Sequence, residues 1–379
     1  EGERSVDSLA KLVHDACSLA LVGAKQSGVD VSYRMDPYRD RVIVDRVQIQ
    51  QGHCLPPDRH ERNILTADEL KAGWRLACMA RVRSDVVVSV APEQRLVIAK
   101  PLEDELLEGV TPEPAVHQVT VSLPEPSLQD QRADFVRLRE ALAPDVSLDS
   151  AALSALRDLP GELREGQFTV SATLLDDRLV GVATLDEAQH PLGVAVDIGT
   201  TTVVAYLVDL VTGEHLGSGT AHNPQAQHGA DVISRTDYAA NQPGGLSRLH
   251  SEAVGVVNQV VNQALEIAGG QADQIIEMTV VGNTCMHHLF LGLDPRHIAQ
   301  APYIPVASDA ITVTPGSLGL KMNAQGRVVC LPVIAGYVGA DTVGVITATR
   351  MMDSDRPVLA VDIGTNGEVA LWSGERLVC

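Results

Sequence analysis

The residues most able to do chemistry lie in two copies of one short pattern. Val194 to Thr202 reads Val-Ala-Val-Asp-Ile-Gly-Thr-Thr-Thr, and Leu359 to Gly367 reads Leu-Ala-Val-Asp-Ile-Gly-Thr-Asn-Gly. In each copy an apolar run ends in Asp, turns at Gly and polar residues, and resumes as a β-rich run. That order is typical of a β-hairpin with a chemically equipped turn.

Such a turn suits a phosphate group. Glycine lets the backbone turn sharply and approach a ligand closely, and successive N–H groups form a concave nest for an anion. An Asp at the strand end can position Mg²⁺, usually through water. One copy would more often be an ordinary hairpin, but two copies predict two related lobes that clamp one phosphate chain. The predicted phosphate-binding residues are Gly199, Thr200, Thr201 and Thr202 in the first turn and Gly364, Thr365, Asn366 and Gly367 in the second, with Asp197 and Asp362 as Mg²⁺ positions.

Several other polar residues leave alternatives open. Asp231 and Arg235 stand four apart on an expected helix, as a surface ion pair or as a cleft carboxylate with a basic partner. Asn283 lies in a loop between an expected strand and helix, either structural or close to a nucleotide. The run from Cys285 to His288 is expected to pack as scaffold rather than to bind metal. Asp341 follows a glycine-rich turn and is a candidate for positioning Mg²⁺ or water.

The paired hairpins resemble the phosphate-1 and phosphate-2 hairpins of the ASKHA superfamily, which includes acetate and sugar kinases, heat-shock chaperone ATPases and actin. The resemblance implies that ATP and Mg²⁺ are bound between two lobes. It places Asp341 in the connect-1 region, which often carries a carboxylate that orients the attacking water. Asp341 and Asp197 are therefore the expected catalytic carboxylates.

Further blocks resemble the reductive activators of corrinoid proteins: Asn223 to Gln225, His228 to Arg235, Val281 to His288, Pro302 to Pro305 and Leu331 to Asp341. In that family a [2Fe-2S] ferredoxin domain, a middle domain and an ASKHA ATPase domain share one chain. The resemblance implies ATP-dependent reduction of a corrinoid from Co(II) to Co(I), with nucleotide-driven closure of the lobes. The implied partners are a corrinoid protein or corrinoid-dependent methyltransferase and an electron donor protein, and a homodimer is left open.

The cysteines needed for the cluster are missing from the expected positions. Gly73 to Cys78 resembles the closing part of a plant-type ferredoxin, whose last cysteine ligates iron. The three remaining ligand positions fall on Asp36, Val42 and Asp45. Because a [2Fe-2S] cluster is held by four ligands, normally thiolates, we expect a degenerate domain without a cluster. Another metal site could draw on His53, Cys54, His60 and Cys78, but their spacing matches no standard zinc pattern.

Composition narrows the function classes. The 379 residues carry a formal charge of −20, which argues against nucleic acid and anionic membranes as partners. No uncharged apolar run is long enough to cross a membrane, and the first residues do not form a secretory signal. The six cysteines are spaced too irregularly for a secreted disulfide framework, so we expect a cytoplasmic protein with reduced thiols.

The expected fold is α/β. It combines a β-grasp ferredoxin-like domain, a small α/β middle domain and a ribonuclease-H-like, actin-like ASKHA domain. The first lobe of that ASKHA domain is expected in full, and the second lobe is truncated. The expected boundaries are 1–91 for the degenerate ferredoxin-like domain, 92–130 for a linker, 131–190 for the middle domain, 191–357 for the first lobe and 358–379 for the start of the second. Since Asp362 lies 17 residues from the last residue, we expect a longer native protein or a shortened sequence.

Particular elements can be predicted as well. Thr66 to Glu69 form a capping box before a short helix. Helices are expected over 5–23, 134–142, 148–159 and 246–268, and strands over 42–49, 86–90, 168–175, 178–184 and 278–281. On the longest helix the apolar stripe is Val254, Val257, Val261 and Leu265.

Two other functions stay open beside corrinoid activation. A paralogue without a cluster would keep the nucleotide switch and the docking surface as a non-redox binding protein or scaffold. An ASKHA small-molecule kinase is a third reading, against which the ferredoxin-like segment and the block from Asn223 to Arg235 argue.

Overall fold

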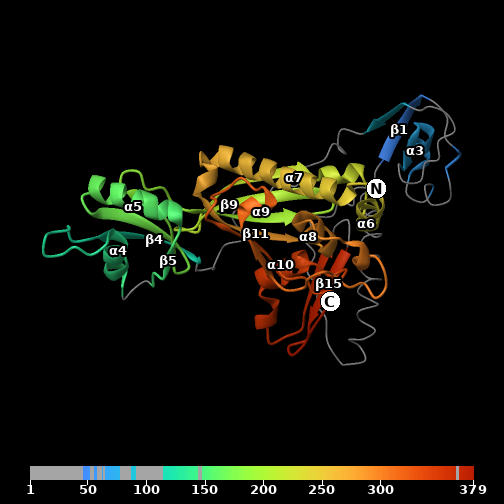
Figure 1. Cartoon of the computed structure of the whole chain (residues 1–379). Helices are drawn as coiled ribbons and strands as arrows, with labels where there is room; N and C mark the ends of the chain where they lie inside the picture. The colour runs from blue at the N-terminus through green and yellow to red at the C-terminus, as the bar shows by residue number, and fades with distance from the viewer. Residues whose placement is uncertain are drawn as a thin grey trace. The chain divides into compact units, whose positions relative to one another are not determined.

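The computed structural model describes residues 46–51, 55–57, 62, 65–76, 87–90, 114–143, 147–363 and 367–379. The chain divides into two compact units, residues 1–101 and 102–379, which are described separately below (Figure 1). Several predictions fall outside the described residues: the helix over 5–23, Cys78, the alternative metal residues His53, Cys54 and His60, and the turn residues Gly364, Thr365 and Asn366.

The first unit contains a small antiparallel sheet. Strand β1 (Arg46–Gln51) lies between β2 (Trp74–Leu76) and β3 (Val87–Val90). The predicted capping box is confirmed at helix α3 (Ala67–Lys71). The Thr66 hydroxyl accepts the Glu69 N–H at 3.2 Å, and the Glu69 carboxylate accepts the Thr66 N–H at 2.7 Å.

The second unit begins with a four-stranded sheet in the order β4-β6-β7-β5 (Val116–Ser122, Thr169–Leu175, Arg178–Thr184, Ser150–Ala151). Helix α4 (Asp134–Leu142) spans the predicted range, and α5 (Leu153–Glu165) packs beside it. The predicted helix over 148–159 is wrong at its start. The Asp149 N–H donates to the Asp177 carbonyl at 2.9 Å, so this segment pairs with β7 before the helix begins.

The central feature is a mixed six-stranded sheet in the order β10-β9-β8-β11-β13-β12. Strands β8 (Leu192–Ile198), β11 (Ile275–Gly282) and β13 (Arg327–Cys330) run parallel, while β9 (Thr202–Asp209), β10 (His215–His222) and β12 (Ile311–Val313) are antiparallel to their neighbours. The first predicted hairpin is β8–β9. Its turn therefore lies at the same sheet edge as the carboxyl ends of the parallel strands.

Helices cover both faces of this sheet. Helix α7 (Gly245–Ala268) packs against β9 and β10, and its predicted stripe of Val254, Val257, Val261 and Leu265 is confirmed as buried (Figure 1). Val280 belongs to the same core, so by strand alternation Val281 faces the other way. Helix α10 (Ala340–Thr349) contacts that second face, because a Cβ on Gly344 would lie 3.5 Å from the Val281 side chain.

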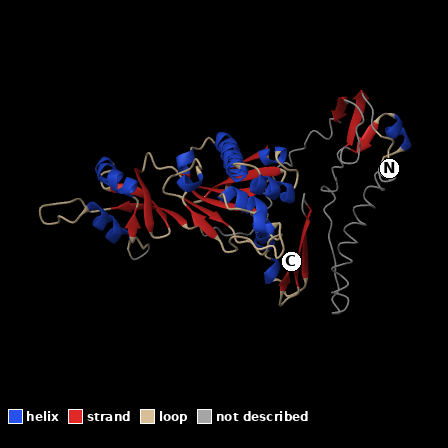
Figure 2. Cartoon of the chain, turned by 45° about the vertical axis from the view of Figure 1, so that its right-hand side comes forward, coloured by secondary structure: helices blue, strands red, loops and turns tan. Residues whose placement is uncertain are grey.

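The second hairpin is also confirmed. Strands β14 (Val358–Ile363), β15 (Gly367–Trp372) and β16 (Leu377–Val378) form an antiparallel sheet, seen beside the C-terminus in Figure 2. Ile346 of α10 and Met351 of the 3₁₀ helix η6 (Met351–Asp353) pack with Ala370 of β15. This small core attaches the second hairpin to the helix that leads out of the first lobe.

Among the described residues, no helix combines the length and the apolar character needed to cross a lipid bilayer.

Candidate functional site

The candidate site lies where chain turns gather at the carboxyl ends of the parallel strands, the edge at which open α/β sheets commonly bind ligands. The ends of β8 and β11 approach closely, since a Cβ on Gly282 would stand 2.7 Å from the Ile198 carbonyl oxygen. A pocket of about 320 Å³ opens beside them. Its lining comes from α6 (Val232–Asn241), from the start of α8 (Thr284–Leu291), from loops and from β15: Val232, Ile233, Thr236, Asn283, Thr284, Cys285, Ile298, Ala299, Gly336, Tyr337, Gly367 and Glu368.

The first turn is fixed from its inner side by buried polar groups. The Asn223 side-chain amide donates to the Gly199 carbonyl at 2.8 Å, and the Asn223 backbone N–H donates to the Thr201 carbonyl at 2.9 Å. The guanidinium of Arg235 donates to the Thr200 carbonyl. Because the C=O and N–H of a trans peptide point in opposite directions, these bonds direct the Thr200 and Thr201 N–H groups away from the buried side. The role of this turn as a phosphate nest stays a prediction.

Two helix N-termini meet next to this turn. Asn283 caps α8 by accepting the Met286 N–H at 3.0 Å, and its side-chain amide donates to the Thr200 hydroxyl at 2.9 Å. Gly339 begins α10 directly against it, because a Cβ there would lie 2.4 Å from the Asn283 Cα. The positive ends of two helix dipoles favour an anion at this point. Asn283 thus supports the first turn while lining the pocket.

Four carboxylates interact across the site. Asp197 and Asp362 are the next-to-last residues of β8 and β14, Asp341 lies in the first turn of α10, and Glu368 is the second residue of β15. Asp197 is surrounded by protein yet reached by water. The surrounding protein removes much of the water from the Asp197 carboxylate, and this desolvation is the main reason that its pKa is raised to about 7. The negative charges of Asp341 and Asp362 contribute to the same rise. Burial raises the pKa of Asp341, opposed by the Thr342 N–H at 2.7 Å, and the charge of Asp362 raises it further.

Glu368 is a site residue that sequence reasoning missed. Burial raises its pKa to about 7, with further contributions from Asp341 and Asp362. A comparison of the two repeats contains the signal, because the sixth residue after Asp362 is Glu368 whereas the sixth after Asp197 is Val203. The second hairpin therefore contributes a carboxylate that the first does not.

The structure settles two of the open alternatives. The predicted surface ion pair between Asp231 and Arg235 is wrong. Asp231 caps α6 by accepting the Ser234 N–H at 2.8 Å, whereas Arg235 is fully buried behind the first turn. The predicted packing of Cys285 to His288 is confirmed, since all four side chains are at most 3% exposed. His288 joins the Thr284 carbonyl at 2.8 Å and accepts the Val306 N–H at 2.9 Å.

The carboxylates fit Mg²⁺ held mainly by water and phosphate. Among the described residues, no three His, Cys, Asp or Glu side chains lie close enough to hold a metal by themselves. Neighbouring carboxylates with raised pKa values would be stabilised by a divalent cation, and Mg²⁺ usually keeps several waters and binds through one or two carboxylates. The iron–sulfur cluster does not fit in the same way, because only Cys78 offers a thiolate at the expected ligand positions.

Comparison with known proteins places most of the second unit in one family. Residues 105–189 match the RACo linker region, and residues 192–354 match the RACo middle region. Over 213 residues the chain is 34% identical to the corrinoid activation enzyme RamQ of Eubacterium limosum, covering 56% of this chain and 36% of RamQ. Over 197 residues it is 27% identical to a [Co(II) methylated amine-specific corrinoid protein] reductase of Methanosarcina barkeri, covering 49% and 35% of the two chains.

A solved structure supports the same relationship. The reductive activator for corrinoid, iron-sulfur protein superposes with a TM-score of 0.66 at 32% identity, covering 88% of this chain and 55% of that one. The chain therefore spans about a third of the length of these curated relatives and about half of the length of the solved one.

A stretch of 51 residues is also 47% identical to the sensor protein FixL of Bradyrhizobium diazoefficiens, covering 14% of this chain and 10% of FixL.

Proposed function

The chain is homologous to the reductive activators of corrinoid proteins, and we propose that it couples ATP hydrolysis to the activation of a corrinoid protein, Co(II) to Co(I). The observation that supports this most is the convergence of Asp197, Asp341, Asp362 and Glu368 beside an anchored, phosphate-binding turn. Together with the homology, it favours a nucleotide-driven activator over a small-molecule kinase.

In this proposal the chain's own residues position the reactants. The turn from Gly199 to Thr202 holds phosphate oxygens with backbone N–H groups. Asp197 and Asp362 would hold Mg²⁺ through its water shell, and the ion would supply positive charge next to the phosphates. Asp341 orients the attacking water. Catalysis of phosphoryl transfer consists mainly of such positioning and charge stabilisation.

The second hairpin contributes carboxylates that are stabilised only when the cation and phosphate are present. Bound nucleotide therefore favours a closed arrangement of the two hairpins over an open one. A ligand shifts such an equilibrium only by its differential affinity for the two states. We propose that closure changes the affinity for the corrinoid partner, while the electron is supplied by a separate donor protein.

A second function is favoured by the missing cysteines. If no cluster is bound, the chain would act as a nucleotide-dependent, non-redox partner of a corrinoid protein. The two functions share the nucleotide site and differ only in electron delivery.

The test is ATP hydrolysis measured with and without a corrinoid protein, alongside the visible spectrum of its cobalt. Stimulated hydrolysis with conversion of Co(II) to Co(I) supports activation, and stimulation without reduction supports the non-redox function. Absence of nucleotide binding would refute both. Asp197→Asn should weaken Mg-ATP binding by at least about tenfold through loss of a charged contact, whereas Asp186→Asn, on an exposed loop, should bind as tightly as the wild type.

A further inference from the structure

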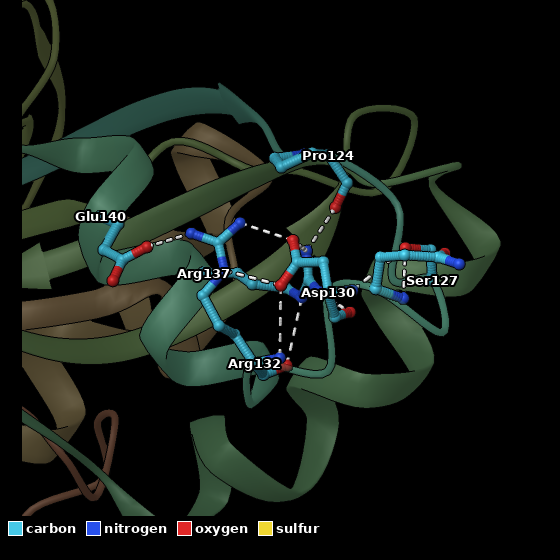
Figure 3. A network of polar contacts seen from close by, with 7 residues as sticks. Pro124, Ser127, Asp130, Arg132, Arg137 and Glu140 are labelled. Atoms are coloured by element: carbon cyan, nitrogen blue, oxygen red, sulfur yellow. Dashed lines mark hydrogen bonds and ion pairs between the residues drawn. The ribbon is translucent and has the colours of Figure 1, made fainter.

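Two arginines are the largest fully buried side chains among the described residues, and they differ in charge compensation. Arg137 in α4 forms an ion pair with Asp130 at 2.9 Å and donates to the carbonyls of Pro124 and Asp130, as Figure 3 shows. Its positive charge is therefore matched where it is buried. This is the usual condition for a buried guanidinium, because an unpaired buried charge is costly.

Arg235 meets only neutral acceptors. Its guanidinium donates to the Gly229 carbonyl at 2.9 Å, the Gln225 side-chain oxygen at 3.3 Å, the Met286 sulfur at 3.1 Å and the Thr200 carbonyl. Within the described part of the chain, no ion pair joins it to a carboxylate. Asp231 and Glu252 act on its charge only from a distance: Asp231 caps α6, and one oxygen of Glu252 accepts from His228 at 2.8 Å.

The position of this charge matters as much as its isolation. One of the four acceptors is the carbonyl of Thr200, in the middle of the first turn, so the guanidinium lies directly behind the nest. An arginine keeps its proton under all physiological conditions. In a poorly hydrated interior its field is weakly screened and reaches the opposite face of the turn. A bound phosphate on that face would supply the missing negative charge.

We propose that Arg235 is the positioning residue of the first phosphate turn, which it anchors through the Thr200 carbonyl while supplying the positive charge that selects a polyphosphate. The proposal rests on the function proposed above and names a determinant of its ligand class. It also accounts for an otherwise costly feature, since the unmatched charge is compensated when the triphosphate binds.

The experiment compares binding of Mg-ATP and of inorganic tripolyphosphate to the whole chain by calorimetry. Arg235→Gln removes the charge, and both affinities should fall on the order of tenfold or more. Arg235→Lys keeps the positive charge but cannot form all four hydrogen bonds of the guanidinium. Its affinity should be within roughly threefold of the wild type. Arg248→Gln, at an exposed position of α7, is the matched control and should change neither affinity.

A second variant keeps Arg235 in place. Gln225→Glu sets a carboxylate against the guanidinium, at the position where the Gln225 oxygen now lies 3.3 Å away. It compensates the charge while the Thr200 anchor remains, so tripolyphosphate affinity should again fall by about tenfold. This arm remains informative if Arg235→Gln does not fold.

The outcomes separate the two proposals. If the wild type binds neither Mg-ATP nor tripolyphosphate, the proposed function fails. If the wild type binds and Gln225→Glu binds equally well, the assignment of Arg235 is overturned. Equal losses in Arg235→Gln and Arg235→Lys would also overturn it, because a purely structural role gives the lysine no advantage.

Discussion

The ionisation of Asp197 is the property of the site most accessible to experiment. Its folded pKa of about 7 lies above the ordinary value of 3.8, so the folded chain holds this proton more tightly than the unfolded chain. The associated stability is fully present below pH 4 and is lost as the pH rises towards 7. Above pH 7 the folded protein carries an ionised carboxylate at a net cost.

Asp197→Asn should therefore raise the melting temperature at pH 8 more than at pH 5, in buffer without divalent cations. The variant removes the cost of ionisation, and each kcal/mol is worth roughly 2–4 °C in a domain of this size. Thermal unfolding followed by circular dichroism gives the comparison, with Asp186→Asn as the control. A melting-temperature difference that is the same at both pH values would contradict the assigned pKa.

Mg²⁺ should stabilise the wild type more than the Asp197→Asn variant. The cation stabilises the ionised carboxylates, so it should raise the melting temperature of the wild type more than that of Asp197→Asn, with the largest difference at pH 8. Titration with MgCl₂, using NaCl at matched ionic strength as the control, tests this. An equal response of both proteins would exclude Asp197 from the cation site.

At the scale of elements, helix α7 supports the first turn indirectly, through Gln225 and Arg235. Leu249 on this helix is fully buried in the core beneath β8 and β9, and its carbonyl accepts the Gln225 side-chain amide at 2.8 Å. Gln225 in turn contacts Arg235. Packing of one helix is thereby linked to the geometry of the phosphate-binding turn.

Leu249→Ala should lower the free energy of unfolding by about 2–5 kcal/mol, because it removes buried methyl groups and leaves a cavity. Ile267→Ala on the same helix, where the side chain is 68% exposed, should change it by less than about 0.5 kcal/mol. Urea unfolding monitored by far-ultraviolet circular dichroism measures both. Similar costs for the two variants would mean that α7 does not pack as described.

Local patterns in the sequence are sufficient to predict the elements that depend on local chemistry. The two hairpins, the capping box at Thr66 and the stripe on α7 follow from spacing alone. The strand β5 does not, because Ser150 pairs with Arg178 of a strand that is distant in sequence. Sheet pairing of a short, weakly apolar segment is decided by tertiary contacts rather than by propensity.

The residues of the candidate site also differ in whether local sequence or tertiary contacts determine their position. Asp197 and Asp341 could be singled out because one directly precedes, and the other directly follows, a recognisable glycine-containing turn. The burial of Arg235 could not, because helical spacing indicates only that it lies four residues from Asp231. Helix α6 packs close to the β8–β9 turn, where Arg235 contacts Thr200. This tertiary contact places the Arg235 guanidinium behind the turn.

At the scale of the molecule, the linker region and the first lobe share polar and apolar contacts. Arg327 of β13 pairs with Asp176 of the β6–β7 turn at 2.6 Å and with Glu277 of β11 at 3.1 Å. Val116 and Leu175 belong to one small core with Ile276. These contacts lie at the start of β11 and β13, the end opposite the phosphate-binding turn. The linker region therefore makes these contacts away from the edge at which we propose that the nucleotide binds.

Electron transfer decides between the two proposed functions, and it depends on thiolates. With Asp36, Val42 and Asp45 at three expected ligand positions, Cys78 supplies a single thiolate. Carboxylates are poor substitutes at an iron–sulfur site, and an apolar side chain ligates nothing. The chain purified in air should therefore contain less than about 0.1 iron per polypeptide and show no charge-transfer bands between roughly 400 and 600 nm.

Reconstitution with ferrous iron and sulfide under anaerobic conditions separates loss of a cluster during purification from inability to hold one. The protein should remain colourless after desalting, while Mg-ATP binding is unchanged, because none of the residues assigned to Mg²⁺ or phosphate is a cysteine. A brown product with two irons per chain would overturn the ligand argument and favour the redox function. A colourless protein whose ATP hydrolysis is still stimulated by a corrinoid partner would identify a nucleotide switch that acts without its own electron carrier.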